Sequence, residues 1–231
     1  MYFVHTPPIW REHPELTAGL LHARGITAEA DVRPQVEHFE AIARERLAHT
    51  AEGDLPEIQA WRRAFSRMGL KPTQYRCASE SLLRRLRKEG SLPRIHPLID
   101  LCNAISVAFA IPIGVLDVQR IAGGIEVRPA RGDELYDAFS GETERPDAGE
   151  TIFADEAGRA HARRWTHRQS AHSAIRPQTY EILLVAEAMH ASGRDDVPRL
   201  LEAVADALRQ AWAIESRATL LTPDAPRFEA A

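Results

Sequence analysis

The spacing of apolar residues divides the chain into a helical first half, a middle of short strands and a helical end. Apolar side chains that recur every three or four residues predict helices over residues 33–48, 56–69, 79–90, 97–110, 177–192 and 198–214. Short apolar runs between glycine, proline and acidic residues predict strands over residues 2–4, 16–21, 113–118, 125–127, 151–154 and 160–169. This order is typical of an α+β fold, so we expect a compact β-structure covered by helices.

Size and composition favour one domain. The chain has 231 residues, of which 44% are hydrophobic, and this is enough to bury a single core. Residues 131–150 are rich in glycine, proline and acidic side chains and are expected to form loops. No repeat or low-complexity tract is present. We therefore expect a single domain over residues 1–222 and a frayed tail over residues 223–231.

Charge and cysteine content exclude several classes of protein. The net charge is −4 and the pI is about 6.2, whereas a protein that coats long nucleic acid is usually basic. DNA is therefore not an expected partner, although a local basic groove for one folded RNA remains open. Cys77 and Cys102 form no CxxC pair, which fits a reducing compartment. The chain has no basic leader and no apolar run of membrane-spanning length, so we expect a cytoplasmic protein with no membrane partner.

Two polar residues lie on one face of the apolar helix predicted over residues 97–110. Asp100 and Asn103 are three positions apart, so their side chains share a face, and a buried carboxylate or amide needs a partner. Either they line a pocket and orient a ligand, or they form a structural pair that satisfies neighbouring backbone groups. Local chemistry alone favours the structural pair.

Two segments are rich in arginine, and one of them contains an indole. Arginine binds phosphate and stacks on bases, and an indole stacks on the terminal base of an RNA strand. The side chains available for such contacts are Arg84, Arg85 and Arg87 in the first segment and Arg163, Arg164, Trp165, Arg168 and Gln169 in the second. The alternative for the second segment is a strand with its indole in the core and its arginines in water.

No motif for a nucleophile, a metal or a cofactor is present. His161, His167 and His172 match no metal-binding spacing, and no HExxH or HxE…CxxC pattern occurs. A GxSxG turn, a P-loop and a Rossmann GxGxxG are also missing from the sequence. We therefore expect no metal and no cofactor, and any hydrolysis must use an activated water.

Five short motifs occur in a fixed order. They are Ser-Glu-Ser-Leu-Leu at 79–83, Leu-Pro-Arg-Ile-His-Pro-Leu-Ile-Asp-Leu-Cys-Asn at 92–103, Ile-Pro-Ile-Gly-Val-Leu-Asp at 111–117, Val-Arg-Pro-Ala-Arg-Gly-Asp-Glu at 127–134 and Thr-Ile-Phe-Ala-Asp at 151–155. This order resembles the B3/B4 editing domain of the bacterial phenylalanyl-tRNA synthetase β-subunit, over roughly residues 71–185. Three further motifs are similar to those of stand-alone members of that group: Lys-Pro-Thr at 71–73, Leu-Leu-Arg-Arg at 82–85 and Arg-Trp-Thr-His-Arg-Gln at 164–169. The resemblance implies a single B3/B4-like domain that acts on aminoacyl-tRNA.

The resemblance also implies a substrate site. The amino-acid pocket would be lined by Arg94, His96, Asp100, Cys102, Asn103, Gly114 and His167, with His96 and Asn103 as candidate catalytic residues. The two arginine-rich segments would hold the tRNA. The leading hypothesis is trans-editing, the hydrolysis of the ester that joins a wrong amino acid to tRNA. The alternatives are a non-catalytic RNA-binding module of the same fold and an amino-acid-binding protein without an RNA partner.

Several positions depart from the family's pattern. The family's pocket histidine aligns with Gly114, its pocket threonine aligns with Cys102, and its tyrosine-recognising glutamate falls near Val185. A glycine pair in a family turn falls near His167 and Arg168, which puts bulk where the family has bare backbone. These departures predict a smaller or more polar amino acid than tyrosine, because a buried partner for the phenol hydroxyl is missing.

Overall fold

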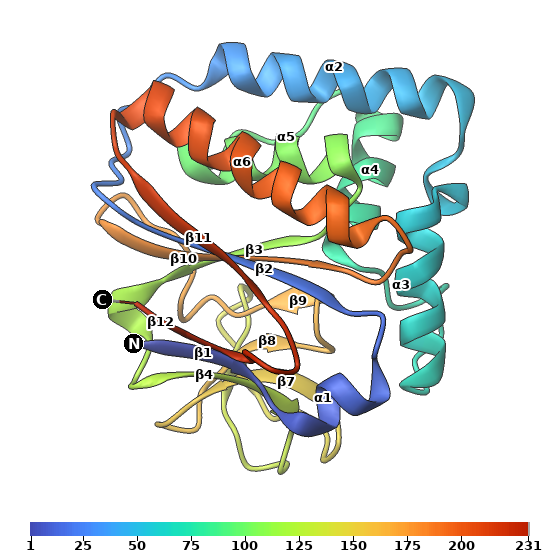
Figure 1. Ribbon diagram of the computed structural model, residues 1–231, viewed down its shortest axis with the longest axis vertical. Coiled ribbons are helices and arrows are strands. Elements are labelled where there is room, and N and C mark those ends of the chain that lie inside the picture. Colours follow the sequence, from blue (N-terminus) through green and yellow to red (C-terminus); the bar gives the residue numbers. More distant parts are fainter. Residues whose placement is uncertain (231) are drawn as a thin grey trace.

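Two β-sheets lie face to face, and helices cover the outer face of one of them (Figure 1). The computed structural model describes residues 1–230. Sheet A has the strand order β12 (Arg227–Glu229), β1 (Tyr2–His5), β4 (Gly124–Pro129), β7 (Thr151–Asp155), β8 (Ala160–Arg163) and β9 (Arg168–Gln169). Sheet B has the order β11 (Ser216–Leu221), β2 (Thr17–Arg24), β10 (Glu181–Ala188) and β3 (Ile113–Asp117). A separate small ribbon pairs β5 (Tyr136–Asp137) with β6 (Thr143–Glu144).

Two apolar cores fill the spaces on either side of sheet B. The helices are α1 (Pro7–Glu12), α2 (Arg33–His49), α3 (Pro56–Arg67), α4 (Ala78–Glu89), α5 (Pro97–Phe109) and α6 (Gly193–Trp212), with 3₁₀ turns η1 (Glu52–Asp54) and η2 (Val118–Arg120). One core joins α2, α5 and α6 to the outer face of sheet B. The other joins both sheets to α1, α3 and α4. No helix within residues 1–230 is long and apolar enough to cross a bilayer.

The α+β fold predicted from the sequence is confirmed, and so is the step from a buried helix to a strand at its centre. α5 and β3 occupy the predicted ranges. Between them Ala110 adopts the left-handed conformation, with φ of 57°, and Ser106 Oγ donates to Ile111 O at 2.7 Å. Pro112 then prevents the helix from continuing, so the chain turns directly into sheet B.

The helix predicted over residues 177–192 is wrong, because this segment forms β10. β10 pairs with β2 on one side and with β3 on the other, so it is a central strand. Leu183 and Val185 face the core between the sheets, whereas Leu184 and Ala186 face the helices. A strand that is buried on both faces has a continuous apolar run, which cannot be told from a buried helix by periodicity.

The predicted strand over residues 160–169 is a hairpin. β8 and β9 pair through Ala162↔Gln169 and Arg163↔Arg168, and the chain reverses between them. Arg164 and Trp165 adopt the left-handed conformation, with φ of 48° and 58°. Neither is a glycine, so no turn signal was visible in the sequence.

Residues 223–230 include a paired strand, contrary to the frayed tail expected over residues 223–231, of which residue 231 lies outside the described residues. β12 pairs with β1 in the register Phe3↔Phe228 and forms one edge of sheet A. Phe228 is 2% exposed, so it belongs to the core. β11, which was not predicted, pairs with β2 at the edge of sheet B.

Candidate functional site

A small pocket lies between the two sheets, beside the β8–β9 turn. Its volume of about 70 Å³ suits a few water molecules or a short side chain. Most of its wall is apolar and comes from Ile113, Leu116, Phe153, Ala162, Trp165 and Val185. Its polar lining consists of His161, Thr166, His167, Arg168, Gln169 and Glu187.

Gly114 leaves part of this pocket open. It lies opposite Val185 in the β3–β10 pair, and a Cβ atom added to it would meet nothing within 4 Å. The glycine is not among those with a left-handed backbone, so the local conformation does not require it. A side chain at position 114 would therefore take up pocket volume without straining the strand.

Glu187 places a buried carboxylate in the pocket. Its side chain is 2% exposed, and Oε1 accepts hydrogen bonds from His5 Nε2 at 2.6 Å and from Trp165 Nε1 at 2.9 Å. Within residues 1–230, the second oxygen, Oε2, accepts no hydrogen bond. A carboxylate oxygen in an apolar pocket is costly unless water or a ligand donates to it, so Oε2 is an anchor for a donor group.

His167 offers a ring nitrogen without a protein partner. Nδ1 lies 2.7 Å from Arg76 O and 3.3 Å from Arg76 N, and the shorter contact places the proton on Nδ1. Nε2 is then an acceptor, and no group in the described chain bonds to it. Burial lowers the pKa of His167, and the charges of Arg164 and Arg168 lower it further despite the contact with Arg76. The ring is therefore neutral at pH 7 and can take a proton from water.

The other histidine of the pocket wall contacts two buried polar side chains, although its Nε2 is not aligned for a hydrogen bond. His161 Nδ1 contacts Ser173 Oγ at 2.8 Å, and Nε2 lies 3.2 Å from Asp155 Oδ2. Ser173 is fully buried and does not line the pocket, so this serine, histidine and aspartate set holds β8 in place rather than supplying a nucleophile. Among residues 1–230, no three His, Cys, Asp or Glu side chains are grouped to hold a metal ion.

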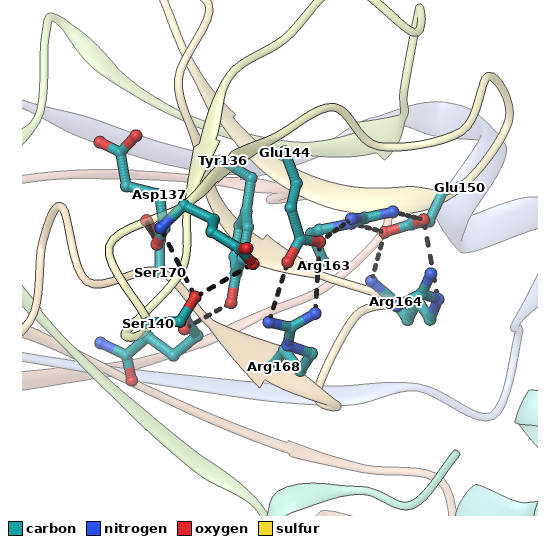
Figure 2. Close-up of polar contacts among 11 residues, drawn as sticks. Tyr136, Asp137, Ser140, Glu144, Glu150, Arg163, Arg164, Arg168 and Ser170 are labelled. Atoms are coloured by element: carbon teal, nitrogen blue, oxygen red, sulfur yellow. Dashed lines mark hydrogen bonds and ion pairs between the residues drawn. The ribbon is translucent and has the colours of Figure 1, made fainter. Parts of the chain in front are cut away.

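Two glutamates brace the β8–β9 hairpin (Figure 2). Arg163 makes a bidentate pair with Glu150, at 2.9 and 2.8 Å, and contacts Glu144 at 2.5 Å. Glu144 also accepts from Arg168 at 3.2 Å, and Glu150 accepts from the backbone N–H of Arg164 at 3.0 Å. Bidentate pairs of this kind fix geometry as well as charge, so the turn that carries His167 is held rigidly.

The helix residues expected in the pocket lie elsewhere. His96 Nδ1 accepts from Leu98 N at 3.2 Å, and Asp100 accepts from Ile95 N at 2.7 Å, so both cap the N-terminus of α5. Arg94 is half-exposed and lies 3.4 Å from Glu40. The structural interpretation of Asp100 is therefore correct, and its placement in a pocket with residues 163–169 is wrong.

Sheet B separates α5 from the pocket. Cys102 is buried in the core between the helices and the outer face of this sheet, and the half-buried Asn103 lies on the same helix. Gly114 and Val185 line the pocket on the opposite face. Burial lowers the pKa of His96, but neither His96 nor Asn103 lines the pocket, so the structure does not bring the candidate catalytic residues to it.

The arginines expected to hold tRNA are largely compensated by carboxylates. Arg84 and Arg87 lie 3.8 and 3.0 Å from Glu52, and Arg85 lies 2.8 Å from Glu89. In the second segment, the Arg163 side chain is only 5% exposed. The remaining exposed cation of that segment is Arg168, at 38%, which also lines the pocket.

Trp165 is fully buried and cannot stack on RNA at the surface. Its ring packs edge to face against Trp61, with centroids 5.4 Å apart, and its Nε1 donates to Glu187. Gln169 Nε2 donates to Val115 O at 2.6 Å, which ties β9 to sheet B at the pocket. The alternative interpretation, with the indole in the core, therefore describes Trp165.

Sequence reasoning missed Glu187. The signal was present in the alternation of a strand, because residues 183, 185 and 187 point to the same face of β10. It was hidden because the segment was predicted to be helical. The position aligned with the family's glutamate is indeed apolar, as Val185, but an acid two residues later lines the same pocket.

The sequence match covers the part of the chain that builds this pocket. The B3/4 domain is matched over residues 60–207, which includes most of α3, both pocket strands of sheet B and the β8–β9 hairpin. The chain belongs to the B3/4 domain family. The B3/4 match contains the whole range, roughly residues 71–185, over which the sequence motifs resemble the family.

Relatives of this B3/4 chain include phenylalanine–tRNA ligase beta subunits. That of Cereibacter sphaeroides is 34% identical over 73 residues, which is 32% of this chain and 9% of the relative. That of Thiobacillus denitrificans is 28% identical over 113 residues, which is 49% of this chain and 14% of the relative. The match thus spans only about a tenth of the length of these curated relatives.

A solved structure is also similar to the B3/4 chain, although weakly. It is an N-terminal fragment of the phenylalanyl-tRNA synthetase beta-subunit from Pyrococcus horikoshii, with a TM-score of 0.49 and 10% sequence identity. The similarity covers 93% of this chain and 49% of the fragment. It adds no argument to the family assignment.

Proposed function

We propose that this chain hydrolyses the ester of a mischarged aminoacyl-tRNA in trans, with the pocket between the sheets as its amino-acid site. One observation carries the proposal: Glu187, whose Oε2 has no hydrogen-bond partner among residues 1–230, lines a small and largely apolar pocket. The names of the relatives, phenylalanine–tRNA ligase beta subunits, support a tRNA-linked substrate.

Glu187 and Gly114 would select the amino acid. The carboxylate would accept a hydrogen bond from the α-ammonium group or from a side-chain hydroxyl, and the space at Gly114 would take the side chain. The free carboxylate oxygen and the opening at Gly114 would favour a small or hydroxylated side chain, such as that of alanine, serine or threonine. A site that pairs with a buried hydroxyl also rejects analogues that lack it, because its own polar group is then left unpaired.

His167 would activate the water. Its Nε2 would accept a proton as the water oxygen bonds to the ester carbonyl carbon. The bond between that carbon and the ribose oxygen then breaks, and the proton returns from His167 to the ribose oxygen. The Arg76 carbonyl, which accepts from Nδ1, would stabilise the imidazolium formed between these two transfers.

The pocket rim would hold the RNA end. Arg168 is partly exposed, and Arg164 stacks over Tyr75 with 4.9 Å between its guanidinium carbon and the ring centroid. Tyr75 in turn contacts the His167 ring. A base or phosphate at this rim would meet a half-buried aromatic ring and two guanidinium groups, a combination that suits single-stranded RNA.

A deacylation panel tests the proposal. The purified chain would be incubated with alanyl-, seryl-, threonyl-, methionyl- and tyrosyl-tRNA, both correctly and wrongly charged. We expect hydrolysis of a small or hydroxylated amino acid and none of tyrosine. His167→Asn keeps an N–H near the Nδ1 position and deletes Nε2, so it should lose roughly 100-fold or more in rate. Selective hydrolysis of tyrosyl-tRNA, or full activity of His167→Asn, would refute the assignment.

Binding of a free amino acid without RNA is a second candidate. It is favoured by the pairing of the α4 arginines with Glu52 and Glu89, which compensates part of their charge. Replacing those arginines would not separate the candidates, because the buried Glu52 would lose its partners and the fold would suffer. Binding of free alanine, serine or threonine with no hydrolysis of any charged tRNA would select this candidate.

A further inference from the structure

Two surface pockets adjoin where the segment before β2 meets the start of α6. The basic pocket is lined by Arg63, Arg67, His190 and Arg194, and the apolar pocket by Trp10, Leu16, Leu220 and Leu221. Pro14, Thr17 and Arg194 line both, so the two are continuous. Their volumes of about 410 and 540 Å³ lie in the range of small-ligand sites.

The basic pocket has an uncompensated positive charge. Arg67 is paired with Glu15, the one carboxylate in its lining. Arg63 and Arg194 are exposed, and neither forms an ion pair within residues 1–230. Two free guanidinium groups at one pocket are suited to a phosphate, which arginine binds through paired N–H donors.

His190 contributes a buried acceptor without a partner. Its side chain is 4% exposed, and Nε2 lies 3.0 Å from Asp196 Oδ2. A carboxylate only accepts, so the proton is on Nε2 and Nδ1 carries the lone pair. Nδ1 is buried and has no hydrogen-bond partner in the described chain. A ligand hydroxyl group that donates a hydrogen bond would satisfy this acceptor.

Trp10 contributes the opposite, a buried donor without a partner. The residue is 8% exposed, and its Nε1 is buried with no acceptor among residues 1–230. The surrounding wall is largely apolar and includes Leu220, whose side chain is 37% exposed. A flat apolar ring that carries an acceptor atom would pack against this wall and accept the hydrogen bond from Trp10 Nε1.

We propose that the two pockets together form a nucleotide-binding site. The phosphate lies between Arg63 and Arg194, a ribose hydroxyl donates to His190 Nδ1, and a ring nitrogen or carbonyl of the base accepts from Trp10 Nε1. A nucleotide presents these three groups in one molecule, whereas an inorganic anion presents only the first. Asp224 lines only the apolar pocket, so it leaves the positive charge of the basic pocket in place.

Binding requires a small local rearrangement. His190 Nδ1 and Trp10 Nε1 are closed to water in the free chain. Side chains around these two atoms therefore have to move as the ligand enters. Exposed side chains change rotamer within picoseconds to nanoseconds, so this step does not limit binding.

Calorimetry with three probes tests the site. The chain would be titrated at low salt with adenosine monophosphate, adenosine and inorganic phosphate. We expect the monophosphate to bind at least about tenfold more tightly than either part. The double variant Arg63→Gln/Arg194→Gln should lose roughly tenfold or more for the monophosphate and leave adenosine binding unchanged. Leu220→Ala should weaken the monophosphate and adenosine but not phosphate.

The matched control is Arg120→Gln, because Arg120 is exposed, lies outside both pockets and forms no ion pair among residues 1–230. The proposal is overturned if the monophosphate fails to bind at millimolar concentration, if phosphate binds as well as the monophosphate, or if Arg120→Gln loses as much as the double variant. A short single-stranded RNA identifies the source. Tighter binding than the monophosphate, lost in the double variant, assigns an RNA nucleotide; no RNA binding assigns a free nucleotide. These outcomes do not depend on whether the chain deacylates tRNA.

Discussion

Filling the space at Gly114 should change which amino acid the chain accepts. A Cβ atom at this position meets nothing within 4 Å, so Gly114→Ala introduces no clash and its methyl group takes up pocket volume. The extended backbone accepts alanine, and the loss of glycine's freedom in the unfolded chain should stabilise the fold by about 0.4–1 kcal/mol. The variant should therefore unfold at a higher temperature than the unchanged chain, while its kcat/KM for the longer amino-acid side chains should fall.

The expected size of the effect follows from the apolar burial that the substrate side chain would lose in the smaller pocket. A substrate side chain that loses the burial of one methylene loses about 0.8 kcal/mol, or roughly fourfold in kcat/KM. Gly114→Val adds two more carbons, and forced overpacking costs about 1–3 kcal/mol, or roughly five- to 150-fold. The loss should rise from alanyl- to seryl- to threonyl-tRNA, because longer side chains compete for the same space.

Single-turnover deacylation of the three charged tRNAs measures this series, with thermal unfolding as the check on stability. Ala218→Val is the matched control, because Ala218 is exposed on β11 and lies outside the pocket. An equal loss for all three substrates would show that position 114 acts through the fold rather than through the pocket. No loss for any substrate would show that the amino acid binds elsewhere.

Three other predictions follow from the titratable groups. Because burial lowers the pKa of His167 below its ordinary value of about 6.5, kcat/KM should be flat above pH 7 and fall only in acid, and His167→Asn should abolish this fall in a pH–rate profile. Burial would raise the pKa of Asp155, but hydrogen bonds from His161 and from backbone N–H groups outweigh it and bring the pKa to about 2. The folded pKa is therefore below the unfolded one, so about 2 kcal/mol of stability should be present above pH 4 and lost as the pH falls towards 2; urea titrations of Asp155→Asn should lack that slope. Burial raises the pKa of Cys77 to about 11 and of Cys102 to about 12, so alkylation followed by mass spectrometry should label both only when the chain unfolds; rapid labelling of the native chain would contradict their burial.

The sequence was most informative where local chemistry decides the structure. α3 and α4 begin and end close to the predicted residues, because Pro56 at the start of α3 and the glycines after both helices act within a single turn. α5 was predicted for the same reason, together with the structural interpretation of Asp100. Capping depends on neighbours in the chain, so one sequence is enough to recognise it.

Features that depend on distant partners were not predicted. β10 is a strand because β2 and β3 flank it, and no residue within β10 records those neighbours. The site shows the same limit: Gly114 and His167 were named from a resemblance, but Glu187 depends on the face of β10 that is turned towards sheet A. The placement of Asn103 in the pocket was wrong. Helical spacing shows which residues share a face of a helix, but it does not show which sheet or pocket that face packs against.

The pairing of β12 with β1 and of β11 with β2 limits the order in which the chain can assemble. The central strand β2 contains an unbroken buried run, yet both of its partners, β10 and β11, come more than 150 residues later in the chain. Nearly the whole chain must therefore be synthesised before the strands of sheet B can pair. Until then an apolar strand remains without partners, which favours slow folding and exposes the nascent chain to aggregation. Removal of β11 and β12 should consequently prevent folding of the whole chain, rather than leave a folded chain that lacks only its edge strands.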